Sequence, residues 1–372
     1  MALTRRELLR WSGLLTGAAT LGGLVLWQRR PGAEGPLLLS ARNDTDGHHY
    51  AVGYYLNGRK AFATRVPERC HAIAPHPFLP VALFVGRRPS TESYLVHLQS
   101  GELLHTLHSQ PDRHFYGHAV FHHSGEWLYA TENDTTDPGR GVLGIYHLDG
   151  LQLRHHDEVP THGIGPHELA WMPDGDTLAV CNGGIRTEAE SRVEMNLHAM
   201  APSLVLMQRD GQLISKEMLA QAKNSIRHMD VASDGTIVTG QQYMGELYES
   251  APLLAIKRPG EAYRAFPLEE PQRQMMQQYT ASIAIHSELR LLAMTAPRGN
   301  RFFVWELDSG KTVVDAPMQD CAGVSAVREG FVVTSGQGSC RGYDCSERGV
   351  PARVSHLDLP AGLWDNHAGL LV

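Results

Sequence analysis

Five histidines stand at matching points of a repeated sequence pattern, which suggests a shared chemical role. Each precedes an alternation of apolar and polar residues, then a turn and a second apolar run. They are His71, His118, His167, His228 and His367. Neutral imidazole is the commonest side-chain ligand of transition metals, and nitrogens that converge from separate strands hold iron, copper or zinc. If the fold brings these side chains together, the pattern predicts a metal site; otherwise they line a wet channel and bond to water and carbonyl groups.

The repeat that carries the histidines is visible along most of the chain. The stretch "GPHELAWMPDGDTLAVCNGG" (165–184) aligns with segments that begin at Cys70 and Gly117. Two later copies keep the two strands and the turn but have alanine, Ala281 and Ala322, where the histidine would stand. Equivalent positions of successive copies are 41 to 61 residues apart, which is typical of a four-stranded propeller blade.

The two ends of the chain complement one another. The last copy, "NHAGLLV" from Asn366, offers one strand, and segments from Leu37, His49 and Phe62 resemble the other strands of a blade. We therefore predict an all-β, seven-bladed β-propeller with WD40/YVTN-like repeats, forming a single domain over residues 35–372. The C-terminal strand would close the ring by pairing with the N-terminal strands, which leaves no large open sheet edge. All five histidines would then approach one mouth of the central channel.

The first residues indicate export. The pair Arg5-Arg6 is followed by an apolar stretch rich in small residues, 11–27, a pattern typical of bacterial twin-arginine signals. We predict that residues 1–34 are such a signal and that the protein is exported folded to the periplasm. The stretch lacks a clear cleavage site, so the alternative is an N-terminal membrane anchor, although the apolar segment is short for a membrane span.

The cysteine count is odd, so at least one thiol cannot pair within the chain. In an oxidising compartment Cys340 and Cys345 are predicted to form a local disulfide. Cys70, Cys181 and Cys321 would remain.

Composition and motif searches exclude several classes of function. The formal net charge is -7 and acidic and basic residues are mixed, so we expect no nucleic-acid partner, and we expect a monomer. The chain has no Gly-x-Ser-x-Gly, no His-Glu-x-x-His, no phosphate-binding glycine loop and no Cys-x-x-Cys-His haem attachment motif. No catalytic residues are predicted, and whether the protein is an enzyme stays open, with binding favoured.

Loops on the predicted histidine face carry polar side chains suited to ligand binding. The candidates are Arg87, Asn133, Asn182, Arg186, Gln241 and Arg298. Ordinary turn chemistry is the alternative for each. Glu168 could add a carboxylate beside His167, but regular strand alternation would point it to the opposite face.

The motifs "GPHELAWMPDG" and "CNGG", with the twin-arginine start and the histidine-led repeats, resemble a bacterial family of exported, propeller-like proteins built on a domain of unknown function. Its genes often lie beside those of imelysin-like iron-uptake proteins. The resemblance implies a periplasmic role in metal acquisition, with iron first and copper or zinc behind, and iron-uptake proteins as partners. The chain also looks like lactonase-type and surface-layer-type propellers, which specifies fold more than function.

Three functions agree with these observations. The first is a periplasmic metal-binding protein whose histidines hold iron, copper or zinc. The second is a metal-assisted enzyme, a lactonase-like hydrolase or an oxidoreductase, that uses the same histidines with an open coordination position. The third is a metal-free interaction scaffold, whose histidines would be individually replaceable without loss of ligand.

Overall fold

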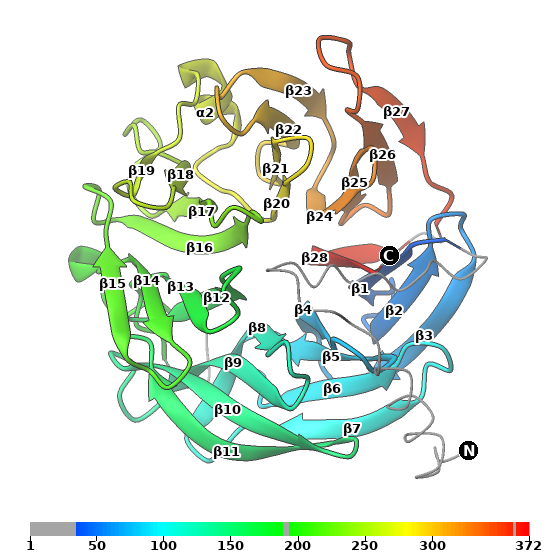
Figure 1. The fold of residues 1–372 in the computed structure, drawn as a ribbon, viewed down its shortest axis with the longest axis vertical. Coiled ribbons are helices and arrows are strands. Elements are labelled where there is room, and N and C mark those ends of the chain that lie inside the picture. The colour runs from blue at the N-terminus through cyan, green and yellow to red at the C-terminus, as the bar shows by residue number, and fades with distance from the viewer. Residues whose placement is uncertain (1–34, 189–192, 360–361, 372) are drawn as a thin grey trace.

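The computed structural model describes residues 35–188, 193–359 and 362–371, which form a closed ring of seven antiparallel sheets (Figure 1). Each sheet has four strands and presents its innermost strand to the centre of the ring. The predicted seven-bladed β-propeller is therefore confirmed. The predicted signal or anchor, residues 1–34, lies outside the described residues. Within the described part of the chain, no helix is long and apolar enough to cross a membrane.

One blade joins the two ends of the chain. Its strands, from the centre outwards, are β28 (Leu363–Leu371), β1 (Leu37–Asn43), β2 (His49–Tyr55) and β3 (Lys60–Val66). Leu38 of β1 stands opposite Leu370 of β28 on one side and Tyr54 of β2 on the other. The predicted closure of the ring by the C-terminal strand is confirmed.

The six other blades each run outwards from the centre in chain order. Two hold β4 (Cys70–Pro75), β5 (Val81–Gly86), β6 (Glu92–His97) and β7 (Leu103–His108), then β8 (Arg113–Phe121), β9 (Trp127–Asp134), β10 (Gly141–Asp149) and β11 (Gln152–Pro160). The next two hold β12 (Pro166–Trp171), β13 (Thr177–Asn182), β14 (Ser203–Gln208) and β15 (Leu213–Glu217), then β16 (Asn224–Val231), β17 (Ile237–Tyr243), β18 (Leu254–Lys257) and β19 (Arg264–Ala265). The last two hold β20 (Ile283–His286), β21 (Leu291–Ala296), β22 (Arg301–Glu306) and β23 (Thr312–Pro317), then β24 (Cys321–Val327), β25 (Gly330–Ser335), β26 (Cys340–Asp344) and β27 (Arg353–His356).

Two short helices lie on connections, η1 (Leu197–Ala199) and α2 (Glu270–Met275). The second is fastened to its blade through the buried side chain of Gln272. Its amide nitrogen donates to Thr312 Oγ1 at 2.8 Å, and its amide oxygen accepts from Trp305 Nε1 at 3.1 Å. The rim helix thereby satisfies the polar edge of a fully buried indole.

The hydrophobic core is a ring of seven clusters, one at each interface between neighbouring blades. Because every sheet is packed between two others, middle strands are buried on both faces, as in β5, where every residue is buried. Trp305 stacks on Phe303 at 5.2 Å in one such interface, and both are fully buried. Burying each large side chain in this way adds about 1.5–3 kcal/mol to the free energy of unfolding. The packed interfaces therefore hold the inner strands in fixed positions.

The predicted disulfide between Cys340 and Cys345 is wrong. All five cysteines are free and buried. Cys340 packs in the cluster that holds Tyr54 and Trp364, whereas Cys345 packs in the cluster that holds Phe331, so the two thiols lie in different inter-blade interfaces. Closeness in sequence misled the prediction, because the two cysteines occupy opposite faces of one blade.

Candidate functional site

Each of the five histidines lies at a β-bulge on an innermost strand. The register shifts fall between Cys70 and Ile73 on β4, Phe115 and Ala119 on β8, Pro166 and Glu168 on β12, Ile226 and His228 on β16, and opposite Ser40 to Arg42 on β28. A bulge adds a residue to one strand, interrupts the alternation of side chains and re-aims them. The histidines therefore point into the channel rather than at the neighbouring blades.

Hydroxyl groups on second strands hold the backbone of these bulges. Thr131 Oγ1 lies 3.1 Å from the carbonyl oxygens of both His118 and His167, in its own blade and in the next. Ser40 Oγ donates to the carbonyl oxygen of His367 at 2.7 Å. Carbonyl groups that the irregular pairing would leave without partners are thus satisfied, and the positions of the histidines are fixed relative to one another.

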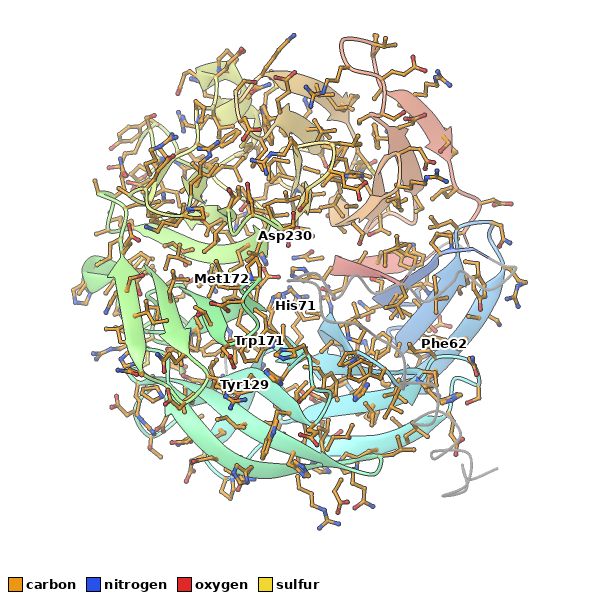
Figure 2. The ribbon with its side chains drawn as sticks, in the orientation of Figure 1. Phe62, His71, Tyr129, Trp171, Met172 and Asp230 are labelled. Atoms are coloured by element: carbon orange, nitrogen blue, oxygen red, sulfur yellow. The ribbon has the colours of Figure 1, made fainter. Side chains whose placement is uncertain are left out.

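The five imidazole rings meet at the centre of the ring. Figure 2 shows His71 and Asp230 there, whereas Phe62 and Tyr129 lie among the sheets. The closest centroid separations are 4.5 Å (His118 and His367), 4.6 Å (His71 and His367), 4.9 Å (His167 and His228, and His228 and His367), 5.0 Å (His118 and His167) and 5.1 Å (His71 and His118). Alanines, Ala281 and Ala322, stand at the equivalent points of the two remaining blades. The structure brings all five predicted side chains together; we call them the histidine cluster.

The histidine cluster is desolvated, and four of its members are buried. Burial lowers the pKa of all five imidazoles. Neighbouring histidines lower it further for all except His71, whose pKa is raised in part by Asp365 and lowered by Arg87 and Arg69. The pKa values of His118, His167, His228 and His367 fall well below the usual value. At neutral pH the rings are uncharged, which is the state in which imidazole binds a metal.

A carboxylate lies behind two of the rings. Glu168 Oε1 is 3.5 Å from Nδ1 of His118, and Oε2 is 3.2 Å from Nδ1 of His228 and accepts from the backbone N–H of Met229 at 3.0 Å. The expectation that Glu168 faces away from the site is wrong, because the bulge on β12 turns consecutive side chains toward the channel. Burial raises the pKa of Glu168 to about 8 in the metal-free protein, so this carboxyl group is largely protonated at neutral pH, and a cation bound to the histidines would favour its ionised form.

Asp365 has the same relation to a third ring. Its Oδ1 is 3.1 Å from Nδ1 of His71, and its Oδ2 accepts from Nε of Arg69 at 2.5 Å and lies 3.9 Å from a guanidinium nitrogen of Arg87. Burial opposes ionisation, but the hydrogen bond with His71 and the two positive charges hold the pKa of Asp365 well below its usual range. Sequence spacing did not single out Asp365 or Glu168; their positions two residues before and one residue after a histidine were the available signal.

The nitrogens of the histidine cluster fit a metal ion. With Nδ1 of His71, His118 and His228 turned to carboxylates, the opposite Nε2 is the ligand atom, and such carboxylate partners are usual behind metal-binding histidines. Nε2 of His118 and of His367 and Nδ1 of His167 are buried and have no hydrogen-bond partner. Buried polar atoms are nearly always bonded, so these nitrogens call for a partner from outside the protein, either a metal ion or ordered water.

Two overlapping triads offer ligand atoms that all lie within 4.8 Å of one another: His71, His118 and His367, and His118, His167 and His228. His118 belongs to both. A tetrahedral ion with bonds of about 2.1 Å needs nitrogens about 3.4 Å apart, so modest rotation of the rings would complete either set.

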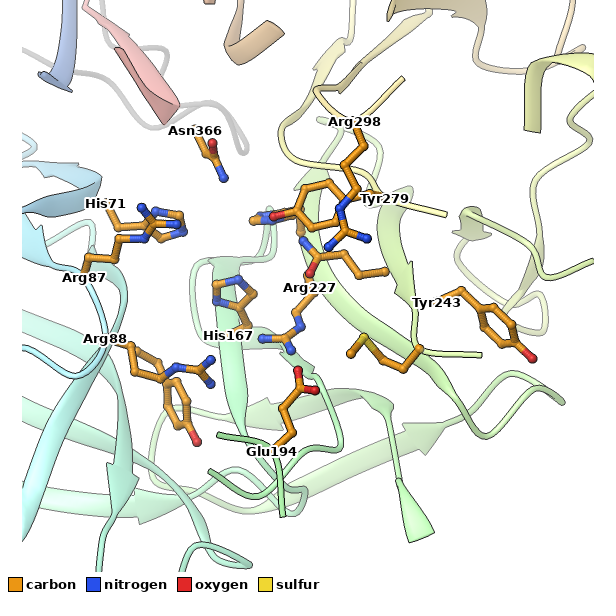
Figure 3. Close-up of a pocket in the computed structure, with 14 residues that line it drawn as sticks. His71, Arg87, Arg88, His167, Glu194, Arg227, Tyr243, Tyr279, Arg298 and Asn366 are labelled. Carbon is orange, nitrogen blue, oxygen red and sulfur yellow. The ribbon is translucent and has the colours of Figure 1, made fainter. Parts of the chain in front are cut away.

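The histidine cluster divides the central channel into two cavities. One, of about 390 Å³, is lined by rim-loop residues and by His71, His167 and His228; Figure 3 shows His71 and His167 in its wall. The other, of about 420 Å³, is lined by the inner strands and reaches His118 and His367.

The rim residues predicted from sequence are dispersed. Arg87 and Arg298 line the 390 Å³ cavity, together with Arg88, Arg227 and Gln242. Three others are buried in structural hydrogen bonds: Asn133 with Tyr116 Oη, Asn182 with the carbonyl oxygen of Thr161, and Gln241 with Thr239 and Tyr263. Arg186 is exposed on the rim and does not line the cavity.

Solved structures similar to this chain are propellers or contain them. Hydrazine synthase of Kuenenia stuttgartiensis matches with a TM-score of 0.59 and 13% identity, over 90% of this chain and 99% of the other. The β-propeller domain of Cps50 (Swd1) from Myceliophteria thermophila matches with a TM-score of 0.56 and 12% identity, over 80% and 92%. Sqt1 of Saccharomyces cerevisiae matches with a TM-score of 0.50 and 14% identity, over 77% and 84%. At such identities the likeness shows the fold alone.

No curated protein matches the sequence. A family model does: the one described as "Protein of unknown function (DUF1513)" matches residues 64–371. The match contains all five histidines and six complete blades, and of the closing blade it contains β28 and the end of β3. It bears out the resemblance to a family built on a domain of unknown function. The chain is therefore a member of the DUF1513 family.

Proposed function

We propose that this protein is a periplasmic metal-binding protein whose histidine cluster holds one first-row transition metal ion, iron foremost and copper or zinc otherwise. The observation that carries the proposal is the cluster itself: five neutral imidazoles converge in the channel, and three have a carboxylate behind them. Ring nitrogens of His118, His167 and His367 are buried and have no partner among the described protein atoms, so each can accept a bond to an ion in the channel.

The chemistry of the donors supports an imidazole site. Nitrogen ligands suit zinc, copper and iron. One thiol, that of Cys181, contacts the backbone of the cluster: its Sγ is 4.0 Å from the carbonyl oxygen of His228. Burial raises the pKa of this thiol well above its usual value, so it stays protonated and is a poor ligand.

Binding is favoured over catalysis. A catalytic site would need an acid or base beside the metal. Among the described residues that line the 390 Å³ cavity, the one carboxylate is that of Glu194, which lies on the loop between β13 and β14 and not on an inner strand. Glu168 and Asp365 are engaged with Nδ1 of the histidines, so neither is placed as an acid or base for a substrate. We propose a role in metal uptake, with periplasmic iron-uptake proteins as partners, on the strength of the sequence resemblance.

The test is elemental analysis of untagged protein purified from the periplasm. The parent should carry near-stoichiometric metal, and His118→Ala should lose it, because His118 belongs to both triads. His286→Ala is the matched control: His286 is equally buried but bonds the carbonyl oxygen of Arg328 outside the cluster. Copper loaded in vitro would not decide the matter, because copper outcompetes other divalent ions at most nitrogen sites. A metal-free parent that also binds no metal on titration contradicts the proposal and supports a scaffold.

A further inference from the structure

A second set of charged side chains converges above the histidine cluster. Four arginines line the 390 Å³ cavity: Arg87, Arg88, Arg227 and Arg298. Among the described residues that line the cavity, Glu194 carries the one carboxylate. A second carboxylate, that of Asp365, lies outside the lining and pairs with Arg69 and Arg87. Among the described residues, five guanidinium groups thus lie near two carboxylates, in a protein whose net charge is -7. The excess of positive charge is local, and it marks this cavity as a site for an anion.

The arginines are partly withdrawn from water, which makes their mutual repulsion costly. Arg227 is 8% exposed, and the side chain of Arg87 is 19% exposed. Burial, followed by the charge of Arg227, lowers the pKa of Arg88 to about 10. Gathering like charges in a low dielectric is unfavourable, and each negative charge that comes close to them lowers this cost. A ligand that brings negative charge would relieve this cost.

The guanidinium groups are held in place before any ligand arrives. Arg88 lies over the ring of Tyr116 at 5.4 Å, and Tyr116 Oη is 3.0 Å from Asn133 Oδ1. Arg298 lies over the ring of Tyr279 at 4.3 Å. Arg227 Nε donates to Ser225 Oγ at 2.8 Å. Figure 3 shows Arg88, Arg227 and Arg298 extending toward the same space. Such preorganisation reduces the entropy lost on binding.

The size of the cavity and the number of arginines indicate the kind of anion. The arginines come from different blades: Arg88 from the loop after β5, Arg227 from β16, and Arg298 from the loop after β21. A cavity of about 390 Å³ is in the range that holds small organic ligands, and three guanidinium groups can pair with more than one carboxylate. Arginine pairs with carboxylates through two parallel hydrogen bonds.

We propose that this cavity binds a small organic anion with two or more separate carboxylate groups, held by Arg88, Arg227 and Arg298. Its remaining oxygen atoms would face His71, His167 and His228 in the lining. If the proposed metal site holds, the anion also completes the coordination of the ion from above. That second step rests on the proposed function, whereas binding of the anion by the arginines does not.

The experiment is calorimetric titration of metal-free protein with citrate as the probe, at low ionic strength. Metal is removed on an immobilised chelating resin, because soluble EDTA is itself a polycarboxylate. We expect saturable binding of citrate that weakens as salt is added, and binding of acetate and of inorganic phosphate at least about tenfold weaker. Phosphate that binds as tightly as citrate would overturn the assignment to an extended organic anion.

Single variants locate the site. Arg88→Gln and Arg298→Gln should each weaken citrate binding by about tenfold to hundredfold. Arg209→Gln makes the same change of charge outside the cavity, on an arginine that is 56% exposed, and should bind citrate as the parent does. Absence of citrate binding up to about 10 mM in folded parent protein that still takes up metal refutes the anion site alone. Citrate binding by protein that takes up no metal supports the anion site and refutes the metal function.

Discussion

Replacing Glu168 by glutamine should weaken metal binding without disturbing the fold. Glu168 Oε2 lies 3.2 Å from Nδ1 of His228, and Oε1 lies 3.5 Å from Nδ1 of His118. With a metal ion bound and Glu168 ionised, this one carboxylate would accept from both Nδ1–H groups and leave Nε2 of two ligands in the same triad for the ion. A glutamine has the same shape and can still accept from the backbone N–H of Met229, but its amide N–H would donate to one Nδ1. That moves the proton of this ring to Nε2, the ligand atom, and removes the ligand.

The expected loss is tenfold to hundredfold in metal affinity, which is about 1.4–2.7 kcal/mol. Competition with a chromophoric chelator measures the affinity at fixed pH, and urea unfolding of the metal-free proteins checks the fold. Glu217→Gln is the matched control, since Glu217 pairs with Lys257 on outer strands at 2.8 Å. If Glu168→Gln binds metal within about threefold of the parent, the assignment of Nε2 as the ligand atom of His118 and His228 is refuted.

Three other changes test separate parts of the structure. Asp365→Asn should lower metal affinity through His71. It should also destabilise the metal-free fold by roughly 1–3 kcal/mol, because the charged contacts of Asp365 with Arg69 and Arg87 are lost while both guanidinium groups stay partly in water. Equilibrium unfolding in urea measures the second effect, and an unchanged midpoint contradicts it. Burial raises the pKa of Glu132 to about 7 from an ordinary 4.5. Between these two pH values the folded protein keeps a proton on Glu132 that the unfolded chain has released. The free energy of unfolding is therefore highest below pH 4.5 and falls as the pH rises to 7. Glu132→Gln should therefore gain about 3 kcal/mol relative to the parent between pH 4.5 and pH 7.5; an equal stability difference at both pH values would show that Glu132 titrates normally. Because all five cysteines are free, the urea-denatured protein should react with five equivalents of a thiol reagent without prior reduction. Reaction of only three thiols would indicate that Cys340 and Cys345 form a disulfide after all.

The repeat pattern predicted more of the site than a single motif could. Five histidines at equivalent points of successive copies had to come together once the copies were arranged in a ring, so their convergence followed from counting. Glu168 could not be placed in the same way. Regular alternation sends neighbours of a strand to opposite faces, and the bulge that overrides this rule on β12 depends on pairing with β13. Asp365 is similar, since its bulge forms only when β28 meets β1 from the other end of the chain.

The arginines of the 390 Å³ cavity show which part of the site the sequence could not predict. Arg87 and Arg298 were candidates because they lie on rim loops, but so were Asn133, Asn182 and Gln241, which the fold uses in internal hydrogen bonds. A loop sequence does not show which of its polar side chains the backbone turns inwards.

By itself the sequence determined the number of blades, the closure of the ring by its last strand, and the five histidines that share one position in the repeat. These follow from periodicity, which is a local property repeated along the chain. Only the tertiary structure decided which carboxylates lie behind the histidines, which arginines face the cavity above them, and that Cys340 and Cys345 lie apart. Each of these depends on strand register and on which face of a blade a side chain occupies, and a bulge that forms only on pairing can reverse that face.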